Sequence, residues 1–204
     1  MITATEALTR LREGNRRFVE AKAIGHHEHR ASLADGQEPF AIILGCSDSR
    51  VPAELVFDLG FGDLFVIRVA GNVVAPSQVG SVEFAAARFG TPLVVVMGHT
   101  QCGAITATLE ELTGQATSES RNLQSIVNRV RPSVESVMAA GKDLDPATLI
   151  REGVRANVRA SANHLRHGSE ILERLIRDSG FMVVGAEYSL ETGVVEFFDG
   201  ISDL

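Results

Sequence analysis

The chain has 204 residues, of which 45% are hydrophobic and 22% are charged, and its formal net charge is −7. This composition suits a single soluble globular domain and excludes a disordered chain. The negative charge argues against nucleic-acid binding, which needs a basic surface, and no stretch approaches the roughly 18 apolar residues of a membrane helix. Charge throughout the first 18 residues excludes a signal-peptide core, so we expect a cytoplasmic protein without membrane or nucleic-acid partners.

An amphipathic helix is predicted over residues 3–22, where apolar side chains recur near one face and Arg and Glu occupy the other. The next stretch, AKAIGHHEHRASLADGQEP, breaks this pattern and is predicted to be irregular. We therefore expect an N-terminal helical arm, residues 1–36, followed by an α/β domain, residues 37–204, in one domain overall. The apolar residues of the helix are Leu8, Leu11, Phe18 and Val19.

The rest of the chain alternates short apolar runs with helical patterns. Continuous rather than alternating apolar runs indicate a mostly parallel sheet covered on both faces, with about four parallel strands and an antiparallel edge strand from a closing hairpin. The expected strands are residues 40–44, 63–71, 92–98, 181–188 and 193–198. The expected helices are residues 52–59, residues 77–90 with Ser77 as N-cap, a helix just after Cys102, and most of 122–178 apart from a break near 141–146.

Metal-binding residue types follow two of these strands. Cys46 comes directly after the first strand and its Gly45, and the third strand leads into His99 and Cys102. Ligand sites of open α/β sheets lie outside the carboxyl ends of the strands, so these side chains are expected to converge. Two thiolates and one imidazole form a ligand set of catalytic zinc, which keeps a fourth position open.

Less specific interpretations of these residues stay open. A lone cysteine is more often a small buried hydrophobe than a ligand, and His-x-x-Cys alone is a weak signal. A second metal candidate is GHHEHR, with His26, His27 and His29, although its irregular flanks favour a solvated arm. His164 and His167 share a helix face without a third partner, which favours a solvated face.

Asp48 and Arg50 follow the first cysteine closely. Arginine can hold a carboxylate through two parallel hydrogen bonds, which usually only fastens a loop. Beside a metal, an aspartate held in this way can accept a hydrogen bond from zinc-bound hydroxide. Alternatively, Asp48 turns inward and takes the fourth zinc position itself, closing the site.

The motif CSDSR (46–50), followed by GHTQCGAI (98–105) and joined to it by FVIRVAGN, resembles the β-class carbonic anhydrases. The resemblance implies reversible hydration of carbon dioxide to bicarbonate and a proton, by attack of zinc-bound hydroxide. It implies one Zn²⁺ per subunit and Asp48 with Arg50 as a catalytic pair. The implied zinc ligands are Cys46, His99 and Cys102.

The resemblance also implies a pocket for carbon dioxide and bicarbonate at a subunit boundary. Family members are dimers or larger assemblies whose N-terminal helix wraps the neighbour, so we expect a homodimer or homotetramer. Phe84 stands where the plant-like branch has a tyrosine at this boundary, and it lacks the hydroxyl. The implied substrate-binding residues are Gln37, Phe65, Val69 and Gly103.

The resemblance favours the plant-like branch with an open active site. Ile43 stands where a regulated bacterial branch carries a tryptophan beside a second bicarbonate site, although Arg68 of that site is retained. Two alternatives remain. Related enzymes hydrolyse carbon disulfide or carbonyl sulfide with the same ligands, and a non-catalytic structural zinc protein would keep Asp48 permanently on the metal.

Overall fold

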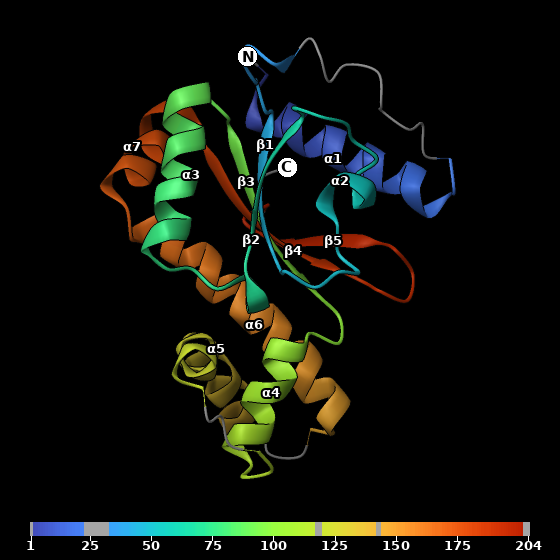
Figure 1. Cartoon of the computed structure of the whole chain (residues 1–204), viewed down its shortest axis with the longest axis vertical. Coiled ribbons are helices and arrows are strands. Elements are labelled where there is room, and N and C mark those ends of the chain that lie inside the picture. The colour runs from blue at the N-terminus through green and yellow to red at the C-terminus, as the bar shows by residue number, and fades with distance from the viewer. Residues whose placement is uncertain (1, 23–32, 117–119, 142–143, 202–204) are drawn as a thin grey trace.

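A five-stranded sheet forms the centre of the computed structural model, which describes residues 2–22, 33–116, 120–141 and 144–201 (Figure 1). The strand order is β2-β1-β3-β4-β5. The first four strands in this order are parallel, and β5 runs antiparallel to β4. The predicted α/β class and the antiparallel edge strand are therefore confirmed. The strands are β1 (Ala41–Gly45), β2 (Leu64–Arg68), β3 (Leu93–His99), β4 (Met182–Tyr188) and β5 (Val195–Asp199).

Helices connect the strands close to where the sequence places them. Four details of the prediction were wrong. The strand expected over residues 63–71 ends at Arg68 and is followed by a 3-10 turn, and the helix expected over residues 52–59 is only Ala53–Val56. Ser77 is not an N-cap, because α3 starts at Pro76, whose fixed φ suits the first helical position. The helical region also breaks a second time, where Ser169 caps α7 by accepting a hydrogen bond from the Leu172 amide. The helices are α1 (Ala4–Val19), α2 (Ala53–Val56), α3 (Pro76–Phe89), α4 (Gly103–Leu112), α5 (Arg121–Ala140), α6 (Pro146–His167) and α7 (Glu170–Ser179), with a 3-10 turn η2 (Ala70–Asn72).

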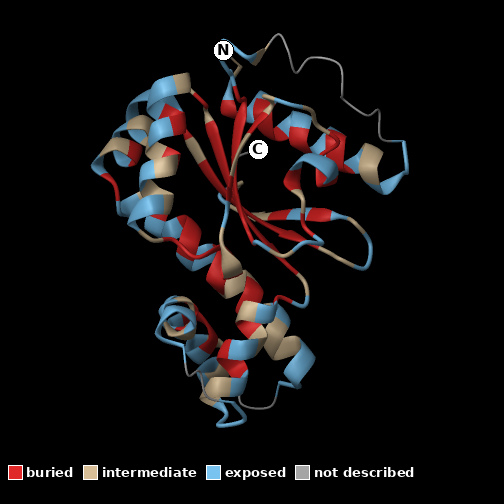
Figure 2. Cartoon of the chain, viewed as in Figure 1, coloured by how far each residue is buried: buried red, intermediate tan, exposed pale blue. Residues whose placement is uncertain are grey.

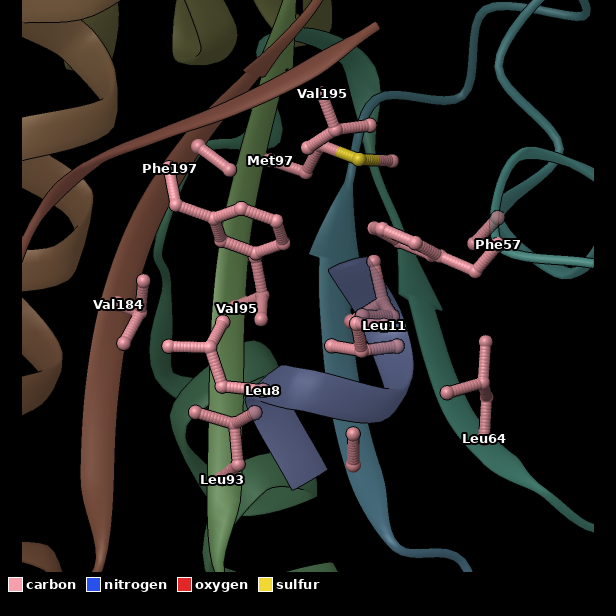
Figure 3. Close-up of a cluster of buried hydrophobic side chains, with 14 of the residues drawn as sticks. Leu8, Leu11, Phe57, Leu64, Leu93, Val95, Met97, Val184, Val195 and Phe197 are labelled. Carbon is pink, nitrogen blue, oxygen red and sulfur yellow. The ribbon is translucent and has the colours of Figure 1, made fainter. Parts of the chain in front are cut away.

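The strands are buried on both faces by helices, as Figure 2 shows. One face packs against α3, α6 and α7, and the other packs against α1 and α2. In Figure 3, Leu8 of α1 lies over Leu93 and Val95 of β3, whereas Leu11 lies in front of β1, and both leucines are almost fully buried. The apolar face of α1 is thus covered by the sheet of its own chain.

A third apolar cluster lies at the carboxyl ends of the strands, where α4 and α5 extend beyond the sheet (Figure 1). It joins α4 and α5 to the first half of α6, and Cys46 and Cys102 are both members of it. The cysteines of the sequence motif therefore lie at the junction between the sheet and this helical group. The other buried members are Val73, Ile105, Leu109, Val130, Val134 and Val154.

Among the described residues, none of the helices is both long enough and apolar enough to pass through a membrane.

Candidate metal centre

Three buried donor atoms meet where β1 and β3 end. Cys46 follows β1 directly, His99 is the last residue of β3, and Cys102 is the N-cap of α4. Because β1 and β3 are hydrogen-bonded neighbours, their carboxyl ends bring these side chains together. The two sulfur atoms and the imidazole nitrogen all lie within 4.8 Å of one another. This is the distance range that a single metal ion requires of its ligands.

The imidazole of His99 is oriented toward the two sulfur atoms. Its Nδ1 donates a hydrogen bond to the carbonyl of Thr100 at 2.8 Å, which leaves the lone pair on Nε2. Nε2 is buried and has no hydrogen-bond partner among the described residues. An unsatisfied buried nitrogen is costly, whereas coordination to a metal would satisfy it.

The two cysteines influence each other strongly. The pKa of Cys46 is lowered, because the Cys102 thiol beside it hydrogen-bonds to its sulfur and outweighs the effect of burial. The same neighbour and burial raise the pKa of Cys102. The Gly71 amide also donates to Cys46 Sγ at 3.4 Å. The environment thus favours ionisation of Cys46 over that of Cys102, and a divalent cation would favour both thiolates. The donor set and the orphaned Nε2 together fit Zn²⁺.

Asp48 and Arg50 form a bidentate ion pair at the edge of this centre. Arg50 donates from Nε to Oδ1 at 2.9 Å and from a terminal nitrogen to Oδ2 at 2.7 Å, and its backbone amide donates to Oδ1 at 3.0 Å. These hydrogen bonds hold the pKa of the Asp48 carboxyl well below its usual range. Asp48 is therefore an ionised acceptor, with Oδ2 lying 3.8 Å from His99 Nε2.

Arg68 supports the loop that carries Cys46, a role that sequence reasoning missed. It lies opposite Gly45 in the β1–β2 register and donates to the carbonyls of Cys46 at 3.0 Å and Asp48 at 2.6 Å. The signal for this role was the position of Arg68 at the end of a strand that neighbours the cysteine strand. Two of its donors are committed to this loop.

Of the four predicted substrate-binding residues, two lie beside the metal centre. Val69 packs against the apolar cluster that contains both cysteines, and Gly103 follows Cys102 as the first residue of α4. Phe65 instead pairs with Ile42, four residues before the cysteine, which is about 13 Å along the strand. Gln37 precedes the start of β1 and is further away. Within one chain, these two residues are not brought to the metal centre.

The described residues contain no second group of three or more His, Cys, Asp or Glu side chains arranged to hold a metal. His164 and His167 lie exposed at the end of α6, outside the group formed by the two cysteines and His99. His26, His27 and His29 lie outside the residues that the structure describes, so the GHHEHR alternative stays a prediction.

Comparisons with known proteins agree with this geometry. Residues 41–195 match the family model described as carbonic anhydrase. "Carbonic anhydrase 2" of Mycobacterium tuberculosis is 37% identical over 199 residues, covering 95% of this chain and 92% of the relative.

Two solved structures share the fold. The β-carbonic anhydrase CafA of Aspergillus fumigatus has a TM-score of 0.77 and 25% identity, covering 97% of this chain and 91% of its own. A structure from a study of two tetrameric β-carbonic anhydrases of Sordaria macrospora has a TM-score of 0.72 and 23% identity, covering 95% of each chain.

Proposed function

We propose, from the premise that this chain belongs to the β-class carbonic anhydrases, that Cys46, His99 and Cys102 are its zinc ligands. The activity of this family is the zinc-dependent reversible hydration of carbon dioxide to bicarbonate and a proton. The observation that carries the assignment is the convergence of three buried donor atoms within 4.8 Å. When bound, zinc supplies Lewis acidity that makes water a nucleophile near neutral pH, an established property of carbonic anhydrases.

Asp48 is proposed to orient the nucleophile. An ionised carboxylate accepts hydrogen bonds but cannot donate them, so it favours a ligand that carries a proton. Arg50 occupies both carboxylate oxygens, which keeps Asp48 ionised and restrains it from turning toward the metal. By restraining Asp48, the pair would leave a bound zinc accessible to solvent and substrate, as an open active site requires.

Substrate binding is proposed to depend on apolar walls and one amide. Carbon dioxide carries no net charge, so side chains such as Val69 provide a suitable surface beside the cysteines. A largely apolar cavity of about 360 Å³ lies next to Gly103 and Ala70, between α4 and α5. The exposed backbone of Gly103 is proposed to donate its amide to bicarbonate.

Gln37 and Phe65 are proposed to serve the metal centre of a second subunit. Phe65 lies on β2, the edge strand of the sheet, and its ring is 6.3 Å from that of Phe84. Phe84 is 53% exposed, which is unusual for a large aromatic side chain. Burial of this aromatic edge in a homodimer or homotetramer would bring Gln37 and Phe65 toward a neighbouring subunit. Sedimentation velocity of the purified protein tests whether such an assembly forms.

The cytoplasm is proposed as the location of the protein. Both described cysteines, Cys46 and Cys102, are free and buried. Thiolate ligands need a reducing compartment, because oxidation would remove their capacity to bind metal.

Paired histidine variants test the proposed function. His99→Ala removes a donor atom, and we expect the loss of both stoichiometric zinc and carbon dioxide hydration. His164→Ala, an exposed histidine of α6, is the matched control and should keep both. The assignment fails if His99→Ala retains zinc and activity, or if the wild-type protein purified without chelators contains no zinc.

A further inference from the structure

The turn between His99 and Cys102 determines how two of the three proposed ligands lie relative to each other. It consists of Thr100 and Gln101, and Gln101 adopts a φ of 53°, a left-handed conformation that is unfavourable for a side chain other than glycine. The carbonyl of Thr100 also accepts the hydrogen bond that orients the His99 ring. A strained turn of this kind persists only when its surroundings hold it.

Glu191 holds this turn from the hairpin between β4 and β5. Its Oε2 accepts a hydrogen bond from the Thr100 hydroxyl at 2.8 Å, and its Oε1 accepts one from the Gln101 side-chain amide at 2.6 Å. These hydrogen bonds, the one from Thr100 foremost, lower the pKa of the Glu191 carboxyl to about 2. Both oxygens of one carboxylate are therefore engaged by the two residues of the turn.

The hairpin adds further bonds to the same turn. The Thr100 amide donates to the Tyr188 carbonyl at 3.0 Å, and the Leu190 amide donates to the Thr100 hydroxyl at 3.0 Å. The Ser189 hydroxyl donates to Glu191 Oε2 at 3.1 Å, which positions the carboxylate itself. The turn is thus joined to the end of β4 by main-chain and side-chain hydrogen bonds.

The hairpin is itself anchored to α1. The side-chain amide of Asn15 donates to the Gly193 carbonyl at 2.8 Å, and its Oδ1 accepts from the Val195 amide at 2.8 Å. Gly193 has a φ of 75°, and a Cβ there would lie 3.1 Å from the Phe18 ring. Asn15 is 5% exposed, so this anchor is buried and fixes the position from which Glu191 reaches the turn.

We propose that Glu191 is a positioning residue of the metal centre: its carboxylate fixes the Thr100–Gln101 turn so that His99 and Cys102 reach the metal in one geometry. The proposal rests on the proposed function, because it assumes that these residues bind zinc. Partners that hydrogen-bond directly to metal ligands commonly change metal affinity by about 10- to 100-fold when removed. Glu191 bonds to the turn between two ligands, so we expect the lower end of this range. Glu191 does not touch the metal, and its effect passes through the turn.

The test compares zinc-loaded wild-type protein with Glu191→Ala, Glu191→Gln and a control, Glu196→Gln. Glu196 lies in the same hairpin but pairs with Arg155 instead of the turn. The first measurement is the rate of zinc transfer to a chromogenic chelator. The second is the visible absorption spectrum of the cobalt-substituted proteins, which reports ligand geometry independently of activity.

We expect Glu191→Ala to release zinc about tenfold faster than the wild type and to shift the cobalt bands. Glu191→Gln keeps one acceptor oxygen and should be intermediate, whereas Glu196→Gln should match the wild type. If Glu191→Ala does not fold, Glu191→Gln decides: its zinc release is expected to be faster than that of the wild type and its cobalt bands to shift.

Unchanged zinc release and an unchanged cobalt spectrum in the Glu191 variants would overturn the positioning role while leaving the proposed function intact. Equal acceleration in Glu196→Gln would also overturn it, since general loosening of the hairpin would then be the cause. A wild-type protein that binds no zinc would reject the proposed function, and the positioning role with it.

Discussion

Oδ2 of Asp48 lies 3.8 Å from Nε2 of His99, the orphaned nitrogen of the metal centre. A carboxylate this close to a metal site is itself a possible zinc ligand. The Arg50 guanidinium donates to both oxygens of the Asp48 carboxylate, which restrains Asp48 from coordinating the metal.

Arg50→Ala is therefore expected to abolish carbon dioxide hydration while zinc remains bound. The freed Asp48 turns to the metal and completes a Cys2HisAsp coordination sphere, which X-ray absorption spectroscopy of the zinc edge will detect. Arg177→Ala is the control, because Arg177 holds Asp178 through a similar pair of hydrogen bonds on α7. Loss of zinc together with activity in Arg50→Ala would contradict this account and assign Arg50 a role in folding.

Removal of zinc is expected to destabilise the protein. Without a cation, the pKa values of Cys46 and Cys102 shift in opposite directions, and Nε2 of His99 stays unsatisfied. At free zinc 100-fold above the dissociation constant, the metal adds about 2.7 kcal/mol to the free energy of unfolding. Calorimetry of chelated and reconstituted protein measures this shift. Zinc should hardly change the free energy of unfolding of Cys102→Ser. If zinc stabilises this variant as much as the wild type, the stabilising zinc binds at another site.

Gly98→Ala is expected to destabilise the fold by about 1–3 kcal/mol through overpacking. A Cβ at this position would lie 2.7 Å from Val158 and 2.9 Å from Val154 of α6, immediately before the ligand His99. Gly80→Ala is the control, because nothing lies within 4 Å of a Cβ there and α3 gains about 0.5–1 kcal/mol from the better helix former. Urea unfolding gives the free energy of unfolding of each variant. If Gly98→Ala is as stable as Gly80→Ala, α6 moves to accommodate the added methyl group without a loss of stability.

The pH dependence of stability is expected to include a contribution from Glu187. Burial raises the pKa of this carboxyl above its ordinary value of 4.5, even though Arg155 lies 3.1 Å away. Between 4.5 and the raised pKa, the unfolded chain releases this proton and the folded chain keeps it. The free energy of unfolding therefore falls as pH rises through that window.

Glu187→Gln removes this titration and should flatten that part of the profile. Urea unfolding measured at several pH values above 4.5 gives the slope for both proteins. An identical slope in the variant would mean that another group is responsible for the pH dependence.

The sequence predicted the parts of the protein that depend on local pattern. The continuous apolar runs that became β1 and β3 favoured buried parallel strands, and each leads through glycine to a metal-binding residue type. Because parallel strands end at one edge of a sheet, the meeting of Cys46 with His99 followed from the topology alone.

Local pattern did not predict contacts made by distant residues. Glu191 is 91 residues from Thr100, and only the pairing of β4 with β3 brings them together. The pattern of α1 also predicted an apolar face without showing what covers it, and that face packs on the sheet of its own chain. The break before α7 did have a local signal, because Gly168 can end a helix and Ser169 can cap the next one. The helical pattern on both sides of these residues nevertheless predicted one continuous helix.

The hairpin that carries Glu191 has a consequence for biosynthesis. The proposed ligands leave the ribosome well before β4 and β5, yet the turn between His99 and Cys102 stays unsupported until that hairpin emerges and docks. In a nascent chain, the thiols of Cys46 and Cys102 are therefore present before the metal centre is complete. Delivery of the ion after this hairpin has docked is the order that the architecture favours.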